Sequence, residues 1–91
     1  MNKFIHEEGR IWLPDEKGDM VAEVLFPTVA TNTVEITHTF VDDSLRGQGV
    51  AGKIMQEAAD EIRSKGLKAQ LTCTYAVAWF DRHKDYKDMV V

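Results

Sequence analysis

The stretch from Gly47 to Gly66 constrains the fold most, because closely spaced glycines lead directly into an amphipathic helix pattern. After the glycines, apolar residues recur at helical spacing with charged residues between them, which predicts a helix with one buried face. Gly66 stands where a helix can end in the left-handed conformation. The apolar positions are Ala51, Ile54, Met55, Ala58, Ala59 and Ile62, and the charged positions are Lys53, Glu57, Asp60, Glu61 and Arg63.

An extended segment is predicted on each side of this helix. Residues 34 to 41 alternate with a period of two, and residues 69 to 75 return as a second strand. A strand-helix-strand crossover of this kind makes the two strands parallel. In the first strand the pattern places Val34, Ile36, His38 and Phe40 on one face and Glu35, Thr37, Thr39 and Val41 on the other.

The N-terminal part of the chain reads as an antiparallel meander. Residues 3 to 13 and 20 to 26 are predicted strands joined by a polar turn at 14 to 19, and a further turn follows at 31 to 33. A short terminal helix is predicted over residues 77 to 84. We therefore expect one α/β (α+β) domain over residues 1 to 91, with a mixed, largely antiparallel sheet of about five strands, one main helix and a short C-terminal helix.

The composition restricts the partners of the protein. A formal charge of -4 opposes binding to nucleic acid or to an anionic membrane. The longest apolar run is too short to span a bilayer, and the start of the chain turns acidic at once. The single cysteine, Cys73, fits a reducing compartment. We expect a cytoplasmic protein that binds neither nucleic acid nor membrane.

The glycines Gly47, Gly49 and Gly52 enter the helix at its N-terminus, where exposed N–H groups and the positive dipole end attract anions. Two phosphate-binding patterns fit this segment in part. A nucleotide-triphosphate loop needs a Ser or Thr where Ile54 stands, and a dinucleotide fingerprint needs an acidic residue where the next strand ends with Thr72, Cys73 and Thr74. A nucleotide-phosphate binder stays open as an alternative.

A third pattern, Arg46-x-x-Gly49-x-Ala51, extends beyond the loop. The segments 38 to 41, 45 to 51, 65 to 68, 73 to 75 and 82 to 86 resemble the very short GNAT-like proteins of bacteria and plants, relatives of the acetyl-coenzyme A-dependent N-acetyltransferases. The resemblance implies that the loop amides bind the cofactor pyrophosphate and that the pantetheine arm lies between splayed parallel strands. The implied cofactor-binding residues are Phe40, Val41, Arg46, Gly47, Gln48, Gly49, Val50, Ala51, Gly52 and Lys53.

The resemblance also raises a question about catalysis. Larger GNAT enzymes commonly protonate the departing thiolate with a Tyr on the terminal helix, and here Phe80 occupies that position. Tyr75 or Cys73 is then the substitute donor, and Cys73 is alternatively a transient acetyl acceptor or a small packed side chain.

His38 is interpreted as a core histidine that could also act as a base near Cys73, because its strand is expected to neighbour the strand that carries the thiol. Glu35 is a third choice of base. The predicted activity is acetyl transfer from acetyl-coenzyme A to an amine of an unidentified acceptor, with proteins and peptides among the candidates and with no metal. The alternative is a non-catalytic module that binds coenzyme A or another protein.

Overall fold

The computed structural model describes residues 3–91 and contains two sheets. The first is antiparallel and has the strand order β1-β2-β3-β6, with β1 at Ile5–Glu7, β2 at Arg10–Pro14, β3 at Met20–Leu25 and β6 at His38–Val41. The second has the order β4-β5-β7, with β4 at Thr28–Ala30, β5 at Thr33–Ile36 and β7 at Lys68–Leu71. Strands β5 and β7 are parallel, as the crossover predicts.

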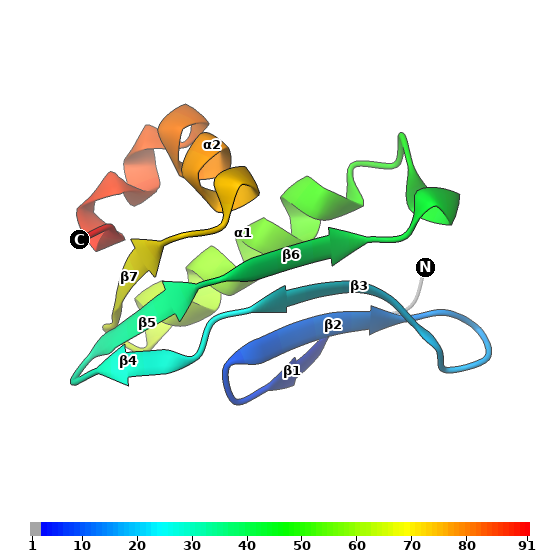
Figure 1. Cartoon of the computed structure of the whole chain (residues 1–91), viewed down its shortest axis with the longest axis horizontal. Coiled ribbons are helices and arrows are strands. Elements are labelled where there is room, and N and C mark those ends of the chain that lie inside the picture. The colour runs from blue at the N-terminus through cyan, green and yellow to red at the C-terminus, as the bar shows by residue number, and fades with distance from the viewer. Residues whose placement is uncertain (1–2) are drawn as a thin grey trace.

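Two α-helices and two 3-10 helices complete the fold: η1 at Asp43–Leu45, α1 at Val50–Ser64, α2 at Thr74–Arg82 and η2 at Lys84–Met89. Helix α1 runs behind the strands, while α2 and η2 gather beside β7 (Figure 1). The apolar face of α1 is buried as the periodicity predicts, and it contacts strands of both sheets. The prediction of a mixed fold with one main helix and a short C-terminal helix is confirmed.

The C-terminal end of α1 follows from local sequence. Gly66 has a φ of 69°, and its N–H donates to the carbonyl of Arg63 at 3.0 Å. The N–H of Leu67 donates to the carbonyl of Ile62, also at 3.0 Å. This pair of bonds is the Schellman ending that satisfies carbonyls left over at a helix terminus.

The strand predicted over residues 34 to 41 is interrupted at Thr37, and the prediction of one continuous face is wrong. Strand β5 pairs with β7, whereas β6 pairs with β3, and the Thr37 N–H donates to Leu25 at the junction. One residue outside the ladder shifts the alternation by one position. His38 and Phe40 are consequently exposed, although Val34 and Ile36 on the same predicted face are buried.

Three other boundaries differ from the prediction. The segment 3 to 13 folds into a hairpin of its own around Gly9, and β4 is an additional strand. Together with the split at Thr37, these raise the number of strands in residues 3–91 to seven rather than about five. Strand β7 ends at Leu71, earlier than predicted, and α2 begins at Thr74, also earlier than predicted. Tyr75 therefore belongs to the first turn of a helix, and Cys73 is its N-cap residue.

Candidate functional site

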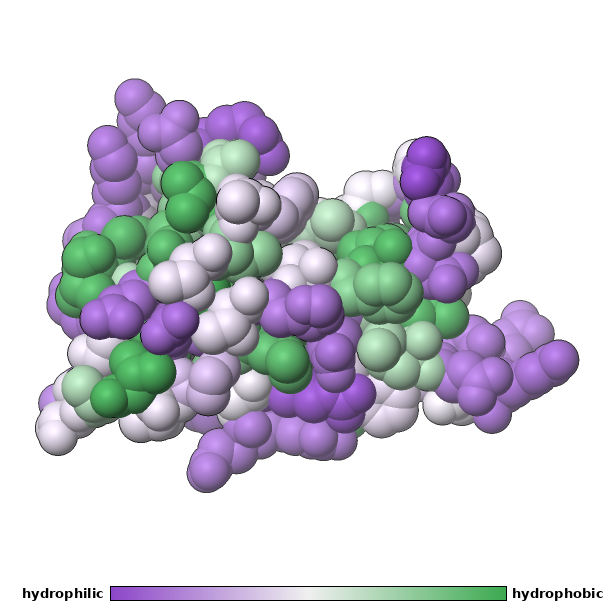
Figure 2. Space-filling model, viewed as in Figure 1, coloured by the Kyte–Doolittle hydropathy of each residue, from purple (hydrophilic) through white to green (hydrophobic). Residues whose placement is uncertain are grey.

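A cavity of about 350 Å³ lies where β6 and the glycine loop meet the start of α1. Figure 2 shows hydrophilic residues gathered on the projecting loop that carries η1, with more hydrophobic residues toward the body of the molecule. The cavity is lined by Val41, Asp42, Asp43, Leu45, Arg46, Gly47, Gly49, Val50, Ala51, Gly52 and Tyr75.

The N-terminus of α1 is open toward this cavity. Gly49 is the N-cap residue and has a φ of 72°, and no side chain in the described part of the chain caps the helix there. Gly47 has a φ of 82°. A Cβ at either glycine would meet no atom within 4 Å. Glycine is therefore favoured at both positions by the left-handed backbone conformation, and not by a lack of space for a side chain. The arrangement presents unsatisfied N–H groups and the positive dipole end to the cavity, which is the chemistry of an anion site.

Hydrogen bonds hold the preceding loop in shape. The Asp42 carboxylate accepts the N–H of Ser44 at 3.0 Å. Hydrogen bonding to the Ser44 side chain, followed by this bond to its backbone N–H, lowers the pKa of Asp42. Arg46 pairs with Asp43 at 2.7 Å, and the Arg46 side chain is 79% exposed. The guanidinium at the rim is thus partly neutralised by its own loop, so the backbone amides are the main source of attraction for an anion.

Three of the residues implied by the resemblance lie outside this cavity. Gln48 lines a different recess with Leu13 on the other side of the loop, and its N–H donates to Leu45. Phe40 is 38% exposed on the outer face of the sheet. Lys53 faces a second cleft between the two α-helices. The remaining implied residues, Val41, Arg46, Gly47, Gly49, Val50, Ala51 and Gly52, line the cavity.

The second cleft, of about 590 Å³, joins the first cavity at Gly49, Gly52 and Tyr75. This cleft was not predicted from the sequence, although the spacing of its residues along each helix is a detectable signal once both helices are placed. Its other lining residues are Phe4, Lys53, Gln56, Glu57, Trp79, Arg82 and His83.

Tyr75 is the predicted catalytic residue that the structure brings to the site. It lines both spaces, and its hydroxyl lies 3.8 Å from the position that a Cβ on Gly52 would occupy. The first turn of α2 therefore places a hydroxyl donor beside the first turn of α1.

Cys73 lies beside β6 and is half-buried at the positive end of α2. Its thiol donates to the Thr39 hydroxyl at 3.4 Å. His38 precedes Thr39 in β6 and so projects to the opposite face, with its Nε2 at 3.9 Å from a Glu23 carboxylate oxygen. The predicted contact between His38 and Cys73 is wrong. Cys73 contacts Thr39, and His38 lies on the opposite face of β6 from Thr39.

The remaining predicted side chains have structural partners. The Glu35 carboxylate accepts the Thr72 hydroxyl at 2.8 Å, which ties β5 to the end of β7. Phe80 is buried, as are Trp79 and Tyr86, so these aromatic residues pack in the core. Across residues 3–91, no helix has the length and hydrophobicity needed to cross a membrane.

The family model described as GCN5-related N-acetyl-transferase matches residues 10–89. Since that match covers most of the sequence, the chain belongs to this family. Protein NATD1 of Xenopus tropicalis is 41% identical over 54 residues, which are 59% of this chain and 50% of that protein. The human Protein NATD1 is 39% identical over the same length, with 48% of it covered. The matched region thus spans about half the length of these curated relatives.

Solved structures agree with the family assignment. A GCN5-like protein of Staphylococcus aureus, solved by NMR, has a TM-score of 0.80 at 27% identity, and the match covers 98% of this chain and 87% of that one. The ribosomal-protein-S18-alanine N-acetyltransferase of Escherichia coli has a TM-score of 0.64 at 17% identity, covering 87% of this chain and 50% of that one. The second likeness concerns the fold alone. The protein therefore has the fold of the GNAT acetyltransferases.

Proposed function

We propose that the protein binds acetyl-coenzyme A and transfers its acetyl group to an amine. The observation that carries the proposal is the uncapped N-terminus of α1, whose N–H groups face a cavity bordered by Gly47 and Gly49 in the left-handed conformation. A diphosphate needs several N–H donors that converge without a metal, and this donor set fits one.

The strand arrangement supports the same cofactor. Strand β6 ends at Val41 on the cavity and is an edge strand, since it pairs with β3 on one side and has no strand partner on the other among the described residues. The backbone groups on its free edge are therefore available to an extended pantetheine arm. Val41, Gly49, Val50, Ala51 and Gly52 are the residues that would hold the cofactor.

The cofactor supplies an acyl thioester, and the protein supplies position and proton transfer. Tyr75 is our candidate for the donor that protonates the departing thiolate, since its hydroxyl lies at the start of α1 and Phe80 is buried without a polar group. Cys73 is the second candidate, because its thiol lies at the N-terminus of α2 and contacts Thr39 of β6. The acceptor amine belongs to an unidentified molecule in the cytoplasm, a protein or peptide included.

Phe80 also favours a second candidate function. A GNAT-like domain that lacks the usual hydroxyl on its terminal helix fits a module that binds coenzyme A without turnover. In that case the cavity at α1 still binds coenzyme A, and the side chains of Tyr75 and Cys73 only contribute to packing.

Isotopically labelled acetyl-coenzyme A, offered with a panel of peptides and polyamines, separates the two. If the protein is an enzyme, label appears in an acceptor. The rate of label transfer should fall at least about 10-fold in Tyr75→Phe if the Tyr75 hydroxyl is the proton donor. Cys73→Ala, followed by mass spectrometry of the protein, tests whether acetyl passes through the thiol. Binding without transfer to any member of the panel favours the module.

A further inference from the structure

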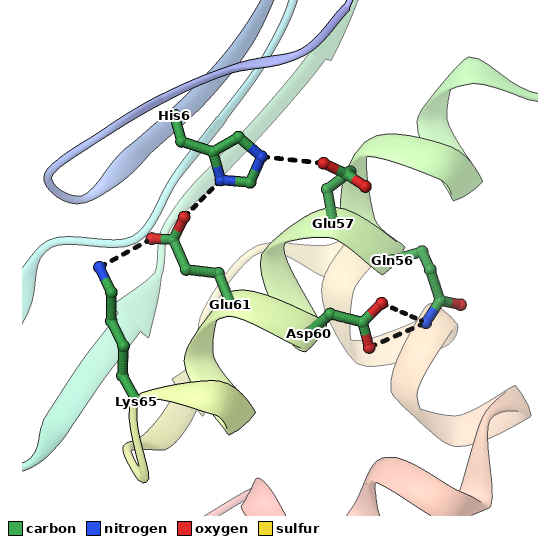
Figure 3. Close-up of polar contacts among 6 residues, drawn as sticks. All are labelled: His6, Gln56, Glu57, Asp60, Glu61 and Lys65. Carbon is green, nitrogen blue, oxygen red and sulfur yellow. Dashed lines mark hydrogen bonds and ion pairs between the residues drawn. The ribbon is translucent and has the colours of Figure 1, made fainter.

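His6 connects the first strand to the main helix. Its Nε2 lies 2.8 Å from Glu57 Oε1, and its Nδ1 contacts a carboxylate oxygen of Glu61 (Figure 3). The two glutamates stand one turn apart on α1, so both present carboxylates toward the same strand. Apart from this bridge, β1 is an edge strand of three exposed residues that pairs with β2 alone.

The contacts define the charge of the imidazole. Carboxylates accept hydrogen bonds, and a neutral imidazole has only one N–H, so two such bonds require the protonated ring. The hydrogen bond to Glu61 is the main cause that raises the pKa of His6 above its ordinary value of 6.5, and Glu57 adds to it. The His6 side chain is 39% exposed, so it can exchange its proton with solvent.

The charges around His6 favour the protonated imidazole. Glu57 and Glu61 touch the ring, and Asp60 lines the same recess. Lys65 follows α1 and lies 3.2 Å from Glu61, and it offsets part of that negative charge. Strand β2 places Ile11 opposite His6, so it contributes no charge there.

Phe4 links this bridge to the candidate site. It stands two residues before His6 and packs against the core, and it lines the cleft between α1 and α2 together with Gly52 and Tyr75. Both side chains lie next to Glu57 of α1, because Phe4 lines the cleft with Glu57 and His6 bonds to its carboxylate. Whatever fastens His6 to α1 therefore also sets the position of Phe4.

We propose that His6 is a positioning residue whose protonated ring fastens β1 to α1 and holds Phe4 in the cleft between the helices. When the ring loses its proton, one of the two hydrogen bonds is lost and the segment detaches more often. The inference rests on the proposed function for its consequence, because the cleft that Phe4 borders is continuous with the cavity at the start of α1.

Hydrogen exchange of residues 3 to 9 tests the bridge without any ligand. Protection is measured between pH 6 and 9, each time relative to an unstructured peptide of the same sequence. We expect protection in the wild type to fall roughly 3-fold to 5-fold across this range, as a partly exposed ion pair is lost. His6→Gln should show low protection that does not vary with pH, whereas the matched surface variant His38→Gln should behave as the wild type does.

The proposal is overturned if His6→Gln keeps the pH dependence of the wild type, or if the wild type shows none. Two further measurements guard against a variant that disturbs the hairpin itself. NMR titration of the wild-type ring must give a midpoint above 6.5, and Glu57→Gln must lower that midpoint. Coenzyme A binding is measured separately: a confirmed bridge in a protein that binds no coenzyme A supports the role of His6 and contradicts the proposed function.

Discussion

The two ends of α1 differ in how the protein treats its polar groups. At the N-terminus, Gly49 offers no cap and the backbone donors face a cavity. In the C-terminal half, side chains are tied on both sides of the helix. His6 bridges Glu57 and Glu61 on one side, and Tyr86 joins Gln56 and Asp60 on the other.

The difference supports the proposal that the N-terminal end of α1 binds a ligand. Leaving helix N–H groups without a partner costs stability, and relative to the Gly49 present here a Ser, Thr or Asp cap recovers roughly a few tenths of a kcal/mol. The chain has no such residue at position 49, whereas the opposite end has a complete Schellman ending and several side-chain bonds. An open end on an otherwise well-bonded helix is the arrangement expected of a binding site.

A negative charge at the open end should have the largest effect. Gly49→Asp introduces a residue that tolerates the left-handed conformation, and it adds a negative charge beside the N-terminus of α1. We expect affinity for coenzyme A to fall about 100-fold by titration calorimetry, through charge repulsion.

Gly49→Asn is the matched control, because it adds a side chain of about the same size without the charge and also tolerates the left-handed conformation. It should fold as well as Gly49→Asp and lose distinctly less affinity. Equal affinities of both variants and the wild type would show that the N-terminus of α1 is not the anion site.

At the closed end, Tyr86→Phe should reduce stability and leave binding intact. The Tyr86 hydroxyl donates to Asp60 at 2.6 Å and accepts from Gln56, and this network joins η2 to α1. Loss of the hydroxyl should cost about 1 kcal/mol, which corresponds to a decrease in Tm of roughly 4 to 8 °C.

Thermal unfolding monitored by circular dichroism measures the change. If coenzyme A affinity falls together with Tm, the two ends of the helix are coupled and the comparison between them fails.

Gly52→Ala should separate stability from binding at one position. Gly52 lies in the first turn of α1 with an ordinary helical φ, and an added methyl meets only the Tyr75 hydroxyl, at 3.8 Å. Alanine favours the helix, so we expect a gain of roughly 0.5 kcal/mol in the free energy of unfolding. The same methyl projects into the cavity and should weaken coenzyme A binding a few-fold.

Chemical denaturation and calorimetry on the same preparation measure both quantities. A variant that gains stability and binds as tightly as the wild type would remove Gly52 from the proposed site.

The smallest effect concerns pH. The pKa of His6 is raised in the folded protein above its unfolded value of 6.5, so its contribution to stability is complete below pH 6.5. That contribution is lost as pH rises through the higher folded pKa. We expect Tm of the wild type to decrease by about 2 to 4 °C between pH 6 and 9 relative to His6→Gln, as suits a partly exposed pair. Parallel Tm curves for the two proteins would contradict this role.

Features that depend on neighbouring residues could be predicted from the sequence. Helix α1 and its ending at Gly66 follow from periodicity and one glycine, and the glycine loop follows from its position before the helix. The resemblance to short GNAT-like proteins implied cofactor-binding residues in the same loop, and most of these residues line the cavity.

Features that depend on pairing between distant segments could not be predicted. The interruption at Thr37 arises because β5 and β6 pair with strands of different sheets, and it reverses the face on which His38 and Phe40 lie. The bridge from His6 to α1 joins residues more than 50 positions apart, which no local pattern reveals. Tyr75 was predicted to lie in a strand, but α2 begins at Thr74, and Tyr75 in its first turn lines the cavity.

The central claim is that the main-chain donors opening α1 bind the diphosphate of acetyl-coenzyme A. Amide NMR of the labelled protein, titrated with acetyl-coenzyme A and in parallel with ATP, tests this directly. We predict saturable shifts that are largest at the amides of Gly47 and of residues 49 to 52, with much weaker response to ATP. Unchanged amides in this loop at saturating acetyl-coenzyme A, or an equal response to ATP, would contradict the account.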